Sequence, residues 1–108
     1  MKNNQPGNFL RFVFISFFLF TTSLLHAQVD MKITKHYLNI PVGTHARMKL
    51  VQLQVNGKMK REFPVQLAED SISYWIFIDV SEFKNQKITI TAPAKEPWLK
   101  RIYQDDVI

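Results

Sequence analysis

Apolar and polar residues alternate along most of the chain after Met31, which is the pattern of β-strands that bury one face. The segments with the length and composition of strands span residues 33–42, 47–55, 58–67, 73–80, 87–92 and, as a last short extended piece, 98–103. They recur at roughly ten-residue spacing, and no long helical pattern separates them. The pattern predicts an all-β fold, a small β-sandwich in the form of a partial jelly roll.

Turn signals lie between these segments. Asn56 and Gly57 tolerate the positive φ angles of a tight two-residue hairpin, so 47–55 and 58–67 should pair as antiparallel strands. Pro41 and Pro64 cannot donate to a strand ladder and indicate edges, exits or bulges. After residue 80, Asp79 or Ser81 is expected to cap a single helical turn that tucks Phe83 beneath the sheet.

The segment 73–80 (SYWIFIDV) is apolar on both faces. Such a strand is typical of the centre of a sheet with two covered faces. One face should join the core, and the other, around Trp75 and Phe77, should need a cover from outside this small domain.

The first 27 residues follow a different pattern. Lys2 and Arg11 precede apolar runs at 12–15 and 17–20, polar residues follow, and the segment ends at Ala27. This is the layout of a cleavable signal peptide, cut after Ala27. A permanent anchor is less favoured, because a membrane-spanning helix needs about 20 apolar residues. No cysteine is present to carry a lipid at the cut, so we expect export to the periplasm or the extracellular space without a stable membrane anchor.

Removal of 27 of the 108 residues leaves 81, which we divide into a sandwich domain over 28–103 and the start of a linker over 104–108. The linker is expected because Pro93 and Pro97 interrupt the strand pattern and no closing strand follows them. Without Lys2 and Arg11, 12 of the 14 basic residues face 9 acidic ones, a net charge of +3. This excess is too small to indicate nucleic-acid binding.

No catalytic set emerges from the sequence. The adjacent carboxylates are assigned to a solvated turn (Glu69, Asp70), a helix cap (Asp79, Glu82) and the linker (Asp105, Asp106). His36 and His45 lack partners at metal-ligand spacing, and neither a nucleophile elbow nor a phosphate loop is present. We therefore expect no catalytic residue, no metal and no cofactor, and no enzyme activity from this chain alone.

Aromatic residues provide the binding candidates. Trp75, Trp98 and Tyr103 are the proposed positions, with Tyr37 and Tyr74 as further rings. Exposed rings can stack on the C–H faces of sugars. Equally, Trp75 could fill the core or contact a partner domain, and Trp98 could pack between domains.

Four stretches, in this order, resemble one family: KHYLNIPVG (35–43), REFPVQLAE (61–69), YWIFIDVSEFKNQKITI (74–90) and LKRIYQDDVI (99–108). They resemble the small N-terminal domain of unknown function that precedes the catalytic domain in exported glycoside hydrolase family 32 enzymes of Bacteroides-type bacteria, which are levanases, inulinases and related β-fructosidases. The resemblance covers residues 33–108 and is weakest over 44–60.

The resemblance implies a catalytic β-propeller as partner, in the same polypeptide or encoded adjacently, and fructan as a second candidate partner. The family's catalytic motifs, Trp-x-Asn-Asp-Pro-Asn, Arg-Asp-Pro and Glu-Cys, are absent from this sequence, so no catalytic role is transferred. Two functions remain open. One is a noncatalytic accessory domain of a fructan-degrading enzyme, and the other is a stand-alone exported module that binds carbohydrate or another surface.

Overall fold

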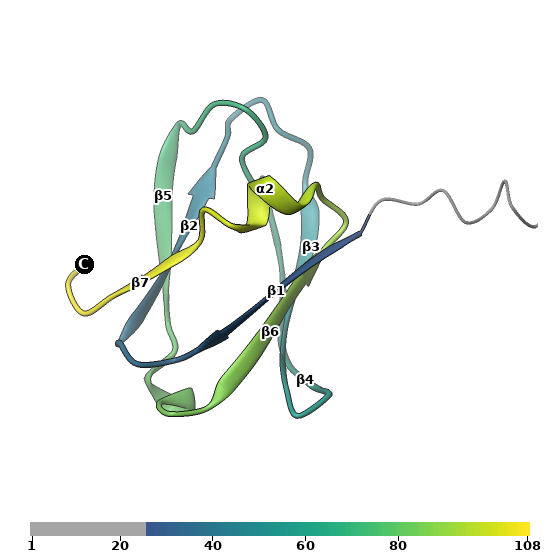
Figure 1. The fold of residues 1–108 in the computed structure, drawn as a ribbon. Coiled ribbons are helices and arrows are strands. Elements are labelled where there is room, and N and C mark those ends of the chain that lie inside the picture. The colour runs from purple at the N-terminus through teal and green to yellow at the C-terminus, as the bar shows by residue number, and fades with distance from the viewer. Residues whose placement is uncertain (1–25) are drawn as a thin grey trace, which may run out of the picture.

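A computed structural model describes residues 26–108, which fold as two antiparallel sheets packed face to face (Figure 1). The four-stranded sheet has the order β1 (Ala27–Lys32), β6 (Lys87–Ala92), β3 (Lys49–Val55) and β4 (Lys58–Val65). The three-stranded sheet has the order β5 (Tyr74–Asp79), β2 (Tyr37–Val42) and β7 (Tyr103–Asp105). Two helical turns, η1 (Ser81–Phe83) and α2 (Glu96–Leu99), connect strands. The predicted all-β sandwich is confirmed.

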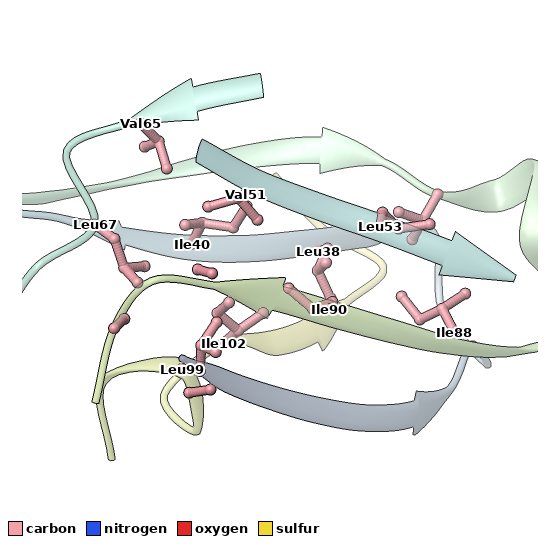
Figure 2. Packing of buried hydrophobic residues seen from close by; sticks show 14 of the residues in the cluster. Leu38, Ile40, Val51, Leu53, Val65, Leu67, Ile88, Ile90, Leu99 and Ile102 are labelled. Carbon is pink, nitrogen blue, oxygen red and sulfur yellow. The ribbon is translucent and has the colours of Figure 1, made fainter. Parts of the chain in front are cut away.

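The core lies between the sheets and is built by the alternation seen in the sequence. Val51, Leu53 and Val55 of β3 are buried, whereas the intervening Gln52 and Gln54 are half-exposed. Figure 2 shows how side chains from both sheets meet in one layer, among them Leu38, Ile40, Val51, Leu53, Ile88 and Ile90. Complete burial of each such side chain contributes roughly 1.5–3 kcal/mol, which makes this layer the main source of stability.

The β3–β4 hairpin also follows the prediction. Asn56 and Gly57 have φ angles of 53° and 79°, and Val55 pairs with Lys58 across the two-residue turn. Pro64 lies in β4, an edge strand, where a residue without an N–H costs no ladder bond.

The predicted first strand over 33–42 is correct over Tyr37–Val42, which is β2, but wrong over 33–36, which link two strands in different sheets. β1 ends at Lys32, and residues 33–36 carry the chain across to β2. Ile33 is buried at this crossing, where its N–H and C=O bond Gln86 and Asn85. A buried Ile in a connection has the same apolar character as a buried Ile in a strand. The hydrophobic pattern therefore could not distinguish the connection from a strand.

Of the two positions predicted from Pro41, the edge is wrong, since β2 is the central strand of its sheet, whereas the exit is correct, since Pro41 is the last but one residue of β2. β7 pairs only with Tyr37–Asn39, so Pro41 lies beyond the end of β7. On that side its C=O accepts the N–H of Ala68 at 3.0 Å. Proline is tolerated here because the partner strand has already ended.

The central position predicted for 73–80 is wrong as well, because β5 is an edge strand. One of its faces joins the core, and none of the described residues covers the other.

Two predictions for the C-terminal segment fail. Of the expected extended piece over 98–103, only Tyr103 is in a strand, whereas Trp98 and Leu99 lie in α2, which has Pro97 in its first turn. The predicted absence of a closing strand is wrong, because Tyr103–Asp105 forms β7.

The signal peptide predicted over 1–27 falls mainly on residues 1–25, outside the described residues; Ala27 itself pairs with Ala92 at the start of β1. Between residues 26 and 108, no helix has the length and apolar character needed to span a bilayer.

Candidate binding face

The outward surface of the three-stranded sheet is the most distinctive feature of the described residues. Leu38 and Ile40 of β2 are buried in the core, so the alternate residues of β2 point outward. Cross-strand pairing then identifies the residues of this surface, which we call the aromatic face: Tyr37, Asn39, Trp75, Phe77, Asp79, Tyr103 and Asp105. Pro41 has the same parity in β2 but is fully buried.

Three rings of the aromatic face are widely exposed, with relative exposures of 41% for Trp75, 46% for Phe77 and 47% for Tyr103. The Trp75 and Tyr103 ring centroids lie 5.3 Å apart at an interplanar angle of 72°. Tyr37 and Phe77 form a second edge-to-face pair at 5.6 Å and 78°. Such pairs favour one arrangement of the rings, so the surface is ordered before any partner arrives.

Asn39 lies in the middle of these rings. It pairs directly with Phe77 on one side and with Tyr103 on the other. Asn39 is only 9% exposed, and its side-chain amide bonds no other described residue. Among the described residues, Arg101 Nε is the one fully buried side-chain polar atom without a partner, so the Asn39 amide still reaches solvent. The aromatic face therefore contains a polar group that is free to bond water or a ligand.

One end of the aromatic face is acidic. Tyr37 pairs with Asp79 on one side and with Asp105 on the other. Asp79 accepts the Ser81 N–H at 2.9 Å and the Ser81 hydroxyl at 2.6 Å, and its second oxygen lies 3.3 Å from His36 Nε2. The Ser81 hydrogen bonds, and then the His36 charge, hold the Asp79 pKa below its usual value. Asp79 and Ser81 were the two residues expected to cap the helical turn η1, and it is the Asp79 side chain that accepts a backbone N–H, that of Ser81.

The structure brings together two of the three predicted binding residues, Trp75 and Tyr103. Trp98 lies elsewhere, half-buried in α2 against the core, and its ring centroid is 5.2 Å from Lys49 Nζ and 5.5 Å from Lys95 Nζ. Tyr74 is 51% exposed but points to the opposite side of β5 from Trp75.

Asn39 is the member of the face that sequence reasoning missed. Asn39 lies two residues after Tyr37, so strand alternation could have placed both side chains on the same face. Only the cross-strand register shows that aromatic rings surround Asn39.

Three of the remaining candidate carboxylates, Glu69, Glu82 and Asp106, have structural partners. Glu69 accepts a hydrogen bond from Lys49 Nζ at 2.9 Å, which holds the Glu69 pKa below its usual value. Asp106 accepts the His36 N–H at 2.9 Å, and Glu82 pairs with Arg61. Glu69 also lines a small hollow of about 160 Å³ with Gly43, His45, Ala46, Asp70, Ser71 and Ser73. Within residues 26–108, no cluster of His, Asp and Glu is arranged to hold a metal ion.

Comparison with known proteins returned no match: no family model fits the chain, and neither a curated protein nor a solved structure is significantly similar to it. The fold and the site together define a class, a small all-β sandwich domain with one exposed aromatic sheet face.

Proposed function

We propose that the chain is a noncatalytic accessory domain of an exported, levanase-like glycoside hydrolase of family 32. The observation that carries this proposal is the uncovered aromatic face, because a contiguous exposed apolar surface on a small domain marks an interaction site. The resemblance of four sequence stretches, in the same order, to the N-terminal domain of these enzymes supports the choice of a family 32 enzyme.

The proposed partner is a catalytic β-propeller, in the same polypeptide or encoded adjacently. A propeller in the same polypeptide would be held near this domain at a raised effective concentration, whereas a separately encoded propeller would have to bind without that advantage.

Export is part of the proposal. A signal peptide at residues 1–27 would deliver the domain to the periplasm or the outside of the cell, where polymeric fructans are accessible.

A stand-alone exported carbohydrate-binding module is the competing function, and the free amide of Asn39 favours it. The two functions differ in what is encoded next to the domain. We expect the DNA after codon 108 to encode a Trp-x-Asn-Asp-Pro-Asn motif, in the same or another frame. An unrelated gene at that place would count against the accessory function.

Activity provides a second test of the proposal. The purified full-length chain, incubated with levan and with inulin, should release no fructose, with a family 32 levanase as the positive control. Release of fructose that scales with the amount of the chain would show that the domain is not merely accessory.

A further inference from the structure

The arrangement of the aromatic face fits the chemistry of a sugar. Trp75, Phe77 and Tyr103 surround Asn39, so apolar rings and an amide alternate over a short distance. A sugar ring offers a C–H surface that packs on aromatic rings, and hydroxyl groups that hydrogen-bond to neighbouring amides and carboxylates.

The state of Asn39 is the observation that points to a ligand. Asn39 is nine-tenths buried among the rings, and its side-chain amide bonds no other described residue although it still reaches solvent. The amide offers two donors and an acceptor, which suit neighbouring hydroxyl groups that can each donate and accept. A hydroxylated ligand on the aromatic face would supply the bonds that the chain leaves open.

The charges restrict the kind of sugar. Asp79 and Asp105 stand on either side of Tyr37 at one end of the aromatic face. Their carboxylates would repel acidic sugars but can accept hydrogen bonds from hydroxyl groups.

From these observations we infer that the aromatic face binds a short segment of a neutral polysaccharide, with Asn39 as the central hydrogen-bonding group and Trp75 and Tyr103 as the stacking rings. The proposed function supplies the identity of this polysaccharide as a fructan, and the inference rests on it for that step.

Calorimetric titration of the full-length chain with levan and inulin oligosaccharides tests the inference, with cellulose oligosaccharides as the comparison. We expect saturable binding of a fructan that weakens at least about tenfold in Trp75→Ala. Tyr74→Ala is the matched control, because it removes an equally exposed ring from the other side of the same strand, and it should leave the affinity unchanged.

The variant Asn39→Leu distinguishes a loss of sugar recognition from a loss of folding. This variant should lose sugar binding while its melting temperature changes little, because the substitution removes no hydrogen bond to another described residue. Binding that survives Asn39→Leu or Trp75→Ala would overturn the inference.

The negative outcomes are distinguishable. In one outcome the chain binds no sugar, but it binds a family 32 catalytic domain and Trp75→Ala abolishes this binding. The face is then a protein contact, so the inference fails and the accessory function stands. If the chain binds cellulose oligosaccharides and no fructan, the face still binds a neutral polysaccharide, but the identification of that polysaccharide as a fructan and the fructan-linked function both fail.

Discussion

Lys49 is the one buried charged side chain between residues 26 and 108, with an exposure of 6%. Its ammonium group donates to the carbonyl oxygens of Arg47 and Leu67, both at 3.2 Å, and to Glu69 Oε2 at 2.9 Å. All three N–H groups of the ammonium are thus used, which is the condition for a tolerated buried charge. The sequence placed Glu69 in a solvated turn, and only the fold shows that it neutralises a lysine.

The pairing predicts a pH-dependent stability. Because the Lys49 hydrogen bond lowers the Glu69 pKa from its ordinary 4.5, the ionised carboxylate stabilises the fold above that pH and loses its contribution as the pH falls through the folded-state value. Thermal melts should therefore show Glu69→Gln less stable than the wild type near about pH 7, with the difference shrinking towards about pH 3. Asp70→Asn, which removes a neighbouring charge, is the control. If Glu69→Gln were less stable than the wild type by the same amount at both pH values, ionisation of Glu69 would not be the cause.

At the scale of single elements, the β3–β4 hairpin depends on Gly57, whose φ is 79°. A Cβ at this position would meet no atom within 4 Å, so a side chain is opposed only by the backbone conformation. Gly43 is the opposite case, since a Cβ there would lie 3.2 Å from the Ser71 carbonyl oxygen and 3.3 Å from Ala68 Cα.

These two glycines predict different responses. Gly57→Ala should lower the free energy of unfolding by about 1–2 kcal/mol, and Gly57→Asn by less, because asparagine adopts positive φ more readily. Urea denaturation measures both values. At Gly43, asparagine should be no better than alanine, because the obstacle there is space. A Gly57→Asn variant as unstable as Gly57→Ala would show that backbone conformation is not the cause.

At the scale of the whole molecule, the C-terminal segment closes the fold. Gln104 Oε1 accepts the N–H groups of Thr34 and Lys35 at 2.7 and 3.2 Å, and Gln104 Nε2 donates to the Lys32 carbonyl at 2.9 Å. One side chain of β7 thus holds the connection through which the chain passes from the first sheet to the second. A segment assigned to a linker on the sequence is part of the sandwich.

Two truncations test this role. Deletion of residues 103–108 removes β7 and the Gln104 bonds and should lower the melting temperature by more than about 10 °C, since each kcal/mol shifts it by about 4–8 °C in a domain of this size. Deletion of 107–108 removes only two residues that are 71% and 72% exposed and should change it little. Similar melting temperatures for both truncations would show that β7 contributes nothing to stability.

Chain connectivity explains which elements could be predicted. β3 and β4 are the only consecutive strands that pair with each other, and both were predicted together with their turn. Every other pairing in the described chain joins strands that are separated in sequence, such as β1 with β6 and β2 with β7. Such pairings leave no local signal, and for that reason the edge position of β5 and the strand β7 were missed.

The sequence by itself determined the class of fold and the hairpin, because alternation and turn propensity act over neighbouring residues. It also supplied Trp75 and Tyr103 as candidate binding residues. Only the tertiary structure decided that these two rings meet, that Trp98 lies apart from them, and that an unpaired Asn39 stands between Phe77 and Tyr103. The reason is physical: the aromatic face is assembled from three strands whose register is set by packing against the other sheet, and no single segment contains that information.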